Sequence, residues 1–365
     1  MKMTFIEAAN RLRDAAGIAV DENRISDAVI LLEQAFTAAF MDKSTTPISV
    51  KLLPEKKLPR QIASIEHVVV HVSSHGIVFY AMYDISSRAL CEFRRFTMIG
   101  EIFSNISKRL PKNNIFECII DLGDGTDVGN YRRIAYSSHR PETVLIPDPY
   151  FHMNDNYNVY RDYVAHEAKP WRDRKDVVFW RGTAGGFQIR NPDPTAPISW
   201  DWHQRLYLCA TCRTSAYADR LDVGLSSHGQ FGDPYWREAI ERAGFLQPEV
   251  PKTQFFQYKY LIDIDGWTNS WSLLDKMIGG ATILKVQSVF GYRQWYYDRL
   301  IPWENYIPIS SDISDLDERI SWVLSHPKEC EIIAGNAASL AADIQLRPEL
   351  TKAESAIIAA LDPVS

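Results

Sequence analysis

The chain has 365 residues, of which 46% are hydrophobic and 24% are charged, and its formal net charge is −6. This composition is that of a folded globular protein, and the length favours two domains over one. The acidic balance argues against a general nucleic-acid-binding protein, which is normally basic.

No apolar run in the sequence is long enough to cross a bilayer, and the first twenty residues carry charges where a signal peptide needs an apolar segment. We therefore expect a cytoplasmic protein. The five cysteines are scattered and odd in number, which favours reduced thiols over a disulfide framework.

The first half of the chain has both helical and strand patterns. Apolar residues return every three to four positions in residues 5–41, which predicts two helices. The proline- and lysine-rich segment 47–60 is expected to be an exposed connector. The further elements expected in this half are a hairpin at 67–83, a helix at 96–110, a buried strand at 115–122, a strand at 143–147 and a loop at 148–158.

The charged segment 160–175 is interpreted as a domain boundary, and a second α/β set is predicted beyond it. Strands alternate with helical patterns in both halves, so we expect two facing α/β domains with a ligand at the C-terminal ends of strands. The elements expected in the second half are a strand at 176–180, a turn at 181–186, a helix at 200–218, a strand at 221–225, a helix at 235–243 and three helices between 313 and 361.

The clearest pattern is a βαβ unit in residues 258–287, with strands at 260–264 and 281–286 and a helix at 269–278. The turn between the first strand and the helix is small and polar, and its residues are Gly266, Thr268, Asn269 and Ser270. Such a turn leaves free N–H groups at a helix N-terminus, where a phosphate is well held. We interpret the turn as a cradle for the diphosphate of a nucleotide sugar.

Several short motifs follow one another over roughly residues 176–345. They are Phe179–Thr183, Tyr258–Leu261 with Gly266 and Ser270, Gly280–Val286, Leu300–Pro308 and Ser311–Leu316. In this order and spacing the chain resembles glycosyltransferase family 90, which includes protein O-glucosyltransferases and bacterial lipopolysaccharide glycosyltransferases. Before residue 110 no resemblance is found.

The resemblance implies a GT-B fold, in which two Rossmann-like domains face each other and the second binds most of the donor. It also implies an inverting, metal-independent transfer from a UDP-sugar to a hydroxyl group, with no cofactor besides this co-substrate. We assign residues 1–165 to an acceptor-side α/β domain with a helical N-terminus and residues 170–345 to a donor-binding domain. Residues 346–365 are expected to form a helix that packs back towards the first domain.

The resemblance further implies an aspartate base at the end of a strand in the first domain, and the matching position is Asp124. Asp121 and Asp127 lie near the same strand end. A carboxylate there suits the removal of a proton from an acceptor hydroxyl. The alternative is a solvated turn, because aspartate and glycine are common turn residues.

Arg181 is the strongest candidate for binding the diphosphate, since a guanidinium presents a planar fork of donors and Gly182 allows the backbone to come close. The alternative is an arginine that forms a salt bridge at a strand end. Thr183, Asn269 and Ser270 can add hydroxyl or amide contacts. Trp271 either belongs to the core or presents a face to the sugar or uracil.

The family usually has an arginine two residues after the serine that matches Ser270, where it assists the diphosphate. This chain has Ser272 at that position. Lys276, one helical turn later, or Lys285, at the end of the next strand, can substitute for it.

For three other patterns, a structural interpretation is compared with a chemical role. Asp263 and Asp265 resemble a metal-binding Asp-x-Asp motif, but strand-end residues are the preferred interpretation. His67, His71 and His75 share a face if the strand continues, and structural roles are favoured over zinc binding. Cys209 and Cys212 form a lone CxxC pair on a predicted helix, which favours buried thiols.

The sequence thus predicts a glycosyltransferase that moves glucose or xylose from a UDP-sugar to a glycan or glycolipid acceptor, such as a lipopolysaccharide or capsule precursor. Nucleic acid is not an expected partner, and peripheral association with a membrane is left open. The alternatives are a protein O-glycosyltransferase and a non-catalytic nucleotide-sugar-binding protein of the same fold, for which Ser272 is the best support.

Overall fold

The structure is a computed structural model that describes residues 5–22, 24–41, 46–82, 93–125, 129–186, 188–189 and 199–364. The chain divides into two compact units. Unit 1 comprises residues 1–153 and 346–365, and unit 2 comprises residues 154–345. The domain boundaries expected near residues 165–170 and 345, and the facing of two domains, stay predictions.

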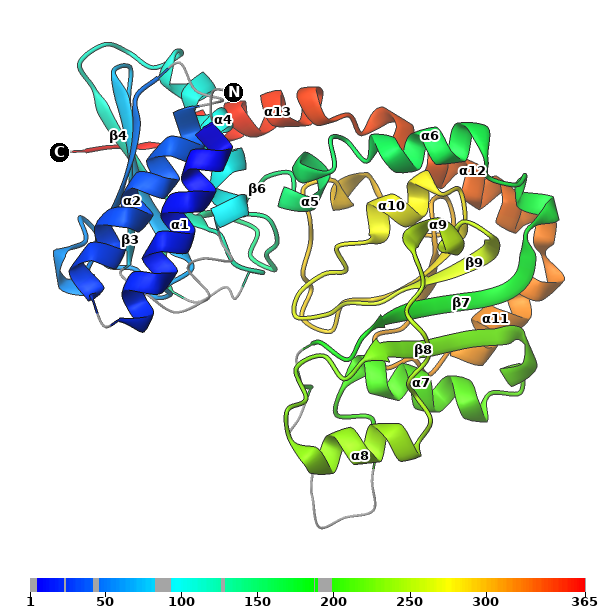
Figure 1. Ribbon diagram of the computed structural model, residues 1–365. Helices are drawn as coiled ribbons and strands as arrows, with labels where there is room; N and C mark the ends of the chain where they lie inside the picture. The colour runs from blue at the N-terminus through cyan, green and yellow to red at the C-terminus, as the bar shows by residue number, and fades with distance from the viewer. Residues whose placement is uncertain are drawn as a thin grey trace. The chain divides into compact units, whose positions relative to one another are not determined.

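Unit 1 has a mixed sheet with helices packed against it (Figure 1). Its strand order is β1 (Ile48–Leu53), β3 (Gly76–Met82), β2 (His67–Ser73), β4 (Ile115–Asp121), β5 (Ile134–Ala135) and β6 (Val144–Leu145), with β12 (Asp362–Pro363) paired to β4. Its helices are α1 (Phe5–Asp21), α2 (Ile25–Met41), α4 (Phe93–Ser107), α5 (Pro149–Met153) and α13 (Leu346–Ile358). The β2–β3 and β2–β4 pairs are antiparallel, and β1 runs parallel to β3.

The core of unit 1 joins α2 and α4 to the sheet through aromatic side chains. Phe79 of β3 stacks on Phe40 of α2 and meets the edge of Phe103 of α4. Helix α13 also packs on α4, where the amide of Asn105 donates a hydrogen bond of 2.8 Å to Glu354. The two N-terminal helices, the hairpin, the helix near 96–110 and the strand at 115–122 are therefore confirmed as elements.

Three predictions for the first half are wrong. Segment 47–60 contains β1, in which Ile48, Val50 and Leu52 are buried on alternate positions, so the proline and lysine residues conceal a strand. The expected loop 148–158 contains α5, and α6 (Asn158–His166) begins at its last residue. The strand predicted at 143–147 is reduced to β6, and β5 was missed, because two-residue strands carry no readable periodicity.

Unit 2 has an all-parallel sheet with helices on both faces (Figure 1). Its strand order is β11 (Ile307–Ile309), β10 (Thr282–Val286), β9 (Tyr258–Asp263), β7 (Lys175–Thr183) and β8 (Leu221–Ser227). Its helices are α6, α7 (Gln204–Thr214), α8 (Pro234–Arg242), α9 (Lys252–Phe255), α10 (Leu273–Ile278), α11 (Leu316–Ser325) and α12 (Pro327–Asp343). The α/β class is confirmed in both units.

The sheet of unit 2 is buried on both faces, which explains the nearly continuous apolar runs of its strands. On one face, Trp180, Ile262 and Val286 join a core to which α7 and α11 contribute. The other face carries α10, which packs against α6 and α12.

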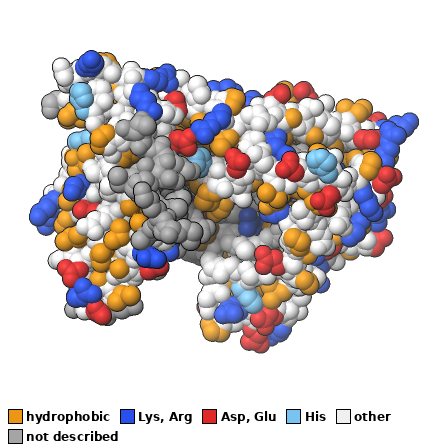
Figure 2. Space-filling model, turned by 45° about the horizontal axis from the view of Figure 1, so that its top comes forward, with side chains coloured by type: hydrophobic (Ala, Val, Ile, Leu, Met, Phe, Trp, Pro, Cys, Tyr) orange, Lys and Arg blue, Asp and Glu red, His pale blue; other side chains and the backbone are white. Residues whose placement is uncertain are grey.

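Side chains of both charges are interspersed over the described part of the molecular face drawn in Figure 2. Within the described residues, no helix combines the length and the apolar character that crossing a membrane requires.

Candidate functional site

The winding of unit 2 reverses between β7 and β9, which are neighbours in the sheet. In chain order the five strands read 2-1-3-4-5, so the chain crosses from β7 to β8 in one direction and then returns past β7 to β9. In open parallel sheets, ligands bind in the crevice where this reversal occurs, beyond the carboxyl ends of the strands. The turns after β7 and β9 are therefore the first place to look for a ligand site.

These two turns lie in direct contact. A Cβ added to Gly186, whose φ is +152°, would lie 3.0 Å from the carbonyl oxygen of Gly266. Only glycine fits there comfortably. Gln230 fixes this arrangement, since it accepts a 3.0 Å hydrogen bond from the Gly186 N–H and donates one of 2.6 Å to the Gly186 carbonyl. The structure thus brings the residues after β7 and the predicted turn 266–271 to one edge of the sheet. The turn predicted at 181–186 begins later than expected, because β7 continues to Thr183.

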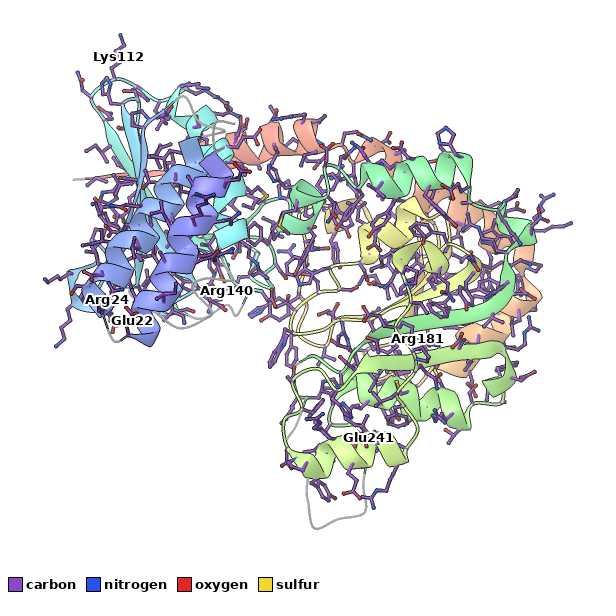
Figure 3. The ribbon with its side chains drawn as sticks, viewed as in Figure 1. Glu22, Arg24, Lys112, Arg140, Arg181 and Glu241 are labelled. Atoms are coloured by element: carbon purple, nitrogen blue, oxygen red, sulfur yellow. The ribbon has the colours of Figure 1, made fainter. Side chains whose placement is uncertain are left out.

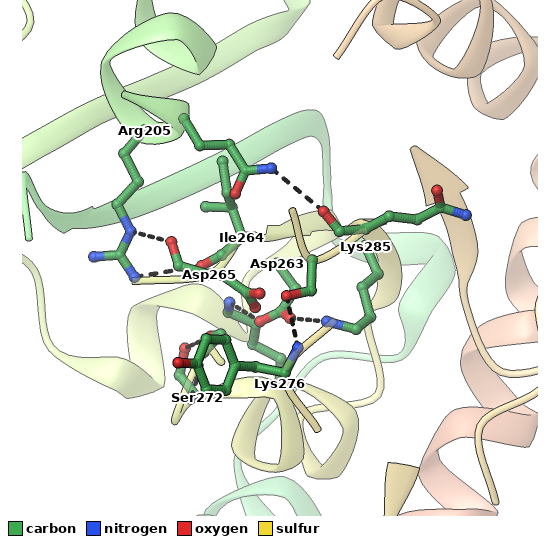
Figure 4. Close-up of polar contacts among 12 residues, drawn as sticks. Arg205, Asp263, Ile264, Asp265, Ser272, Lys276 and Lys285 are labelled. Atoms are coloured by element: carbon green, nitrogen blue, oxygen red, sulfur yellow. Dashed lines mark hydrogen bonds and ion pairs between the residues drawn. The ribbon is translucent and has the colours of Figure 1, made fainter. Parts of the chain in front are cut away.

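Arg205, in the first turn of α7, joins the two turns (Figure 4). Its guanidinium donates hydrogen bonds to the carbonyls of Thr183 (2.9 Å), Asp265 (2.8 Å) and Ile264 (3.3 Å). Burial lowers the pKa of Arg205 to about 10, although Asp265 and Asp263 counteract this effect, so the group stays charged at neutral pH. Sequence reasoning missed Arg205, because nothing in the local pattern relates a helix arginine to turns on either side of it.

Asp263, the last residue of β9, lies in a buried charge cluster with two lysines (Figure 4). Lys276 Nζ donates to its Oδ1 at 2.7 Å, and Lys285 Nζ donates to its Oδ2 at 3.1 Å. Burial alone would raise the pKa of Asp263, but the two ammonium groups outweigh it and hold the pKa below the usual range. Both lysines are thereby engaged, and their predicted contact with a diphosphate stays a prediction.

The helix predicted at 269–278 is shorter than expected. Helix α10 begins at Leu273, so Thr268, Asn269 and Ser270 belong to the preceding turn rather than to the helix. The Ser270 and Ser272 hydroxyls are 3.1 Å apart. Serine, threonine and asparagine side chains compete with helical hydrogen bonds, which explains the late start.

The turn after β9 lines a small hollow, whose volume of about 300 Å³ includes space that is open to solvent. Gly186, His203, Arg205, Asp265, Gly266 and Thr268 all border it. Of the predicted residues, Gly266 and Thr268 border the hollow. Asn269 and Ser270 follow Thr268 in the chain and are buried, and Trp271 is half-buried. Gly182 and Thr183 lie at the end of β7, where the Thr183 carbonyl meets Arg205.

Arg181 lies between β7 and β8 (Figure 3). Its Nη2 forms a 2.5 Å ion pair with Asp222 of β8, and its Nη1 donates to the carbonyls of Trp180 (2.9 Å) and Asp222 (3.2 Å). This ion pair is the alternative weighed from the sequence, and the contact of Arg181 with a diphosphate stays a prediction.

In unit 1, Asp124 lies three residues beyond the end of β4 and is 34% exposed at its side chain. Arg95 of α4 holds it, since Nη2 donates to Asp124 Oδ1 at 2.8 Å and Nη1 donates to the Leu122 carbonyl at 2.7 Å. Its accessible carboxylate meets the first requirement for a general base. Sequence reasoning missed Arg95.

The neighbouring carboxylate of Asp121 is fully buried. Its Oδ1 accepts a 2.8 Å hydrogen bond from the Gly123 N–H, and its Oδ2 lies 3.5 Å from His67 Nε2. The other ring nitrogen of His67 lies 2.5 Å from the Tyr131 hydroxyl. Asp121 is therefore inaccessible to an acceptor, while Asp127 lies outside the described residues.

The histidines and the CxxC pair have structural surroundings. His71 pairs with Glu117 at 3.0 Å, whereas His67 faces Asp121, so the two histidines take different partners from β4. In the part of the chain that the structure describes, no three His, Cys, Asp or Glu side chains gather as a metal site would need. Cys209 and Cys212 are buried free thiols, as predicted, and burial raises the pKa of Cys209 to about 12.

Comparison with known proteins places the second half of the chain among glycosyltransferases. The model of glycosyl transferase family 90 matches residues 155–347, more than half of the chain. Protein O-glucosyltransferase 2 of Danio rerio is 38% identical over 170 residues, which cover 47% of this chain and 29% of that protein. Uncharacterized protein 035R of Invertebrate iridescent virus 3 is 28% identical over 191 residues, 49% of this chain and 16% of that protein.

The chain thus matches less than a third of the length of either relative. Among solved structures, Anabaena HepE in complex with UDP-glucose has a TM-score of 0.34 and 11% identity, over 59% of this chain and 54% of that chain. A likeness of that degree carries no argument.

Proposed function

Because the chain belongs to glycosyl transferase family 90, we propose that it transfers a sugar from a UDP-sugar to a hydroxyl group of a glycan acceptor. The observation that carries the proposal is the hollow at the reversal between β7 and β9, bordered by polar groups from two turns and by Arg205. This is where a parallel sheet binds a nucleotide. Glucose and xylose are the first donors to test.

The proposed reaction is a single displacement with inversion. Asp124 takes the proton of the acceptor hydroxyl while its oxygen forms a bond to the anomeric carbon, and the bond from that carbon to the UDP oxygen breaks on the opposite face. UDP leaves with the negative charge. Donors from unit 2 stabilise that charge without a metal ion in this proposal, and the candidates are Arg181, Arg205, Thr183, Asn269 and Ser270.

The test is a panel of UDP-sugars with the purified chain, in which release of UDP is measured with and without glycan acceptors. Asp124→Asn keeps the size of the side chain and removes the base, so we expect transfer to fall by about 10²- to 10⁴-fold while UDP affinity is unchanged. Asp362→Asn, at a carboxylate of unit 1 that is 69% exposed, is the matched control and should keep full activity. Unchanged turnover in Asp124→Asn, or a product with retained anomeric configuration by NMR, would contradict the mechanism.

A protein acceptor is the second candidate, favoured by the name of the Danio rerio relative. Polypeptide and glycan acceptors offered side by side decide between the two. A non-catalytic nucleotide-sugar-binding protein is the third, because Ser272 stands where the family usually has an arginine. Calorimetry with UDP that shows binding, together with no turnover of any donor, would favour it.

A further inference from the structure

The carboxylate of Asp265 borders the hollow, and the fold provides it with no hydrogen bond of normal geometry from the described residues. Asp265 is 8% exposed. Burial raises its pKa, an effect that Lys285 and the Ser288 hydroxyl only partly offset. Arg205, its cationic neighbour, is bonded to the Asp265 carbonyl instead. A buried carboxylate left in this state costs stability, which indicates a partner that arrives with a ligand.

Among the described residues, two further polar atoms on residues that border the hollow have no hydrogen bond of normal geometry. These are His203 Nε2 and Thr268 Oγ1, on residues that are 1% and 2% exposed. At the outer side, Val289 and Phe290 are exposed apolar residues. The hollow therefore combines a polar floor with an apolar edge, which is the usual composition of a site for a small organic ligand.

The proton on His203 can be assigned from its surroundings. Its Nδ1 accepts the Leu206 N–H at 3.4 Å, so this nitrogen carries no hydrogen. Burial, aided by Arg205, lowers the pKa of His203 to about 4, although its own backbone and that of Gly186 oppose the shift. The ring is neutral at pH 7, and the proton is on Nε2, which becomes a donor on a residue that borders the same hollow as Asp265.

The charges of Asp265 and Arg205 limit which chemical group of a ligand can bind in the hollow. An ionised carboxylate accepts hydrogen bonds only, so its partner must donate. A phosphate is repelled by Asp265, and an ammonium group is repelled by Arg205, which leaves a neutral group with two adjacent donors. A pair of neighbouring hydroxyls meets this condition.

We propose that Asp265 is a specificity-determining residue whose carboxylate accepts both hydroxyls of a vicinal diol of the donor, while His203 Nε2 donates to an oxygen of the same ligand. This inference rests on the proposed function. A nucleotide sugar offers such a diol on its ribose and on its hexose, and the nucleotide diphosphate lies away from Asp265 in either case.

The test is calorimetry of the full chain and of Asp265→Asn with UDP, ADP and GDP, with the 2′-deoxy form of each, and with UDP-glucose and UDP-2-deoxyglucose. A hydrogen bond to a charged group is worth enough that the wild type should prefer UDP over 2′-deoxy-UDP by about 10- to 100-fold if the ribose diol is bound. Asp265→Asn should remove that preference by weakening UDP alone. If the hexose diol is bound, the preference and its loss appear between UDP-glucose and UDP-2-deoxyglucose instead.

Several outcomes separate this inference from the proposed function. Asp219→Asn, at an exposed carboxylate, is the matched control and should keep the wild-type preference. An Asp265→Asn variant that retains both preferences, or a wild type that binds UDP with neither preference, overturns the diol site and leaves the proposed function standing. A wild type that ignores UDP but binds ADP or GDP over their 2′-deoxy forms, with the preference lost in Asp265→Asn, supports the diol site and overturns the UDP-sugar function. Binding of none of these nucleotides overturns both.

Discussion

Asp263 and Asp265 are two residues apart at the end of one strand, yet their carboxylates lie in opposite surroundings. Asp263 belongs to the charge cluster with Lys276 and Lys285, where both of its oxygens receive an ammonium group. Asp265 borders the hollow, and in the described residues neither of its oxygens receives a hydrogen bond of normal geometry. The difference shows two roles of a buried charge. The carboxylate of Asp263 is paired within the fold, and we infer that the carboxylate of Asp265 is paired by a ligand.

The same difference appears in the direction of the two pKa values. The pKa of Asp263 lies below its ordinary value, so its ionised form stabilises the native state above that value and this stabilisation is lost as pH falls. The pKa of Asp265 lies above its ordinary value, so its ionised form costs native stability as pH rises. Functional residues commonly occupy positions where they lower the stability of the native state.

The largest expected effect is on stability, from Asp263→Asn. This change leaves two buried ammonium groups without their carboxylate, and breaking a buried ion pair from one side costs about 3–5 kcal/mol. Urea unfolding at pH 7 measures the loss. Asp265→Asn is the matched control, for which we expect an unchanged or slightly higher free energy of unfolding, because a costly buried charge is removed.

Equal losses in the two variants would show that Asp265 is as much a structural residue as Asp263. A repeat at pH 4 sharpens the test. There the penalty of Asp263→Asn should change little, because pH 4 is still above the ordinary pKa of 3.8, whereas any gain from Asp265→Asn should shrink, because Asp265 is then closer to its protonated form.

The next effect concerns His203, the donor assigned to the hollow, and it is measured as the pH dependence of the free energy of unfolding. The pKa of His203 is about 4 in the native state against 6.5 for the free side chain, so the unfolded chain binds the proton first as pH falls from 6.5 to 4. Native stability is lost over that window, by about 2–3 kcal/mol between pH 7 and 4.5. In His203→Gln this part of the loss should disappear, as measured by urea unfolding at both pH values. An identical pH dependence in the variant would mean that the fold does not lower the pKa of His203.

Much of the fold around this comparison was predictable from local pattern. The strands of the βαβ unit are apolar runs bounded by turn residues, and β9 and β10 lie within a few residues of their predicted bounds. The preferred interpretation of Asp263 as a strand-end residue also agrees with the structure, where it is the last residue of β9. The start of α10 was wrong, because Thr268–Ser270 prefer a turn that the helical periodicity does not record.

What the sequence could not supply is the partner of each charged group. Arg205 meets the carbonyl of a residue 60 positions away, and Arg95 meets Asp124 from 29 positions away. Such contacts are decided by which strands become neighbours, and local periodicity carries no information about them. For the same reason the sequence left open whether Arg181 forms a salt bridge, and β8 places Asp222 against it.

The smallest expected effect on stability distinguishes Arg205 from Arg181, the two arginines at the carboxyl end of the unit 2 sheet. Arg205→Lys removes the fork that reaches three carbonyls of both turns, and it should cost about 1–2 kcal/mol of stability, since each hydrogen bond is worth about 1 kcal/mol and one can be retained. Arg181→Lys retains a positive charge beside Asp222, whose side chain is 40% exposed, and should cost less than about 1 kcal/mol. Calorimetry with UDP then decides their roles: a weaker affinity in Arg205→Lys alone places the phosphates between the two turns beside the hollow. A weaker affinity in Arg181→Lys alone means that UDP displaces Asp222 from its ion pair, and the ligand would then lie towards β8.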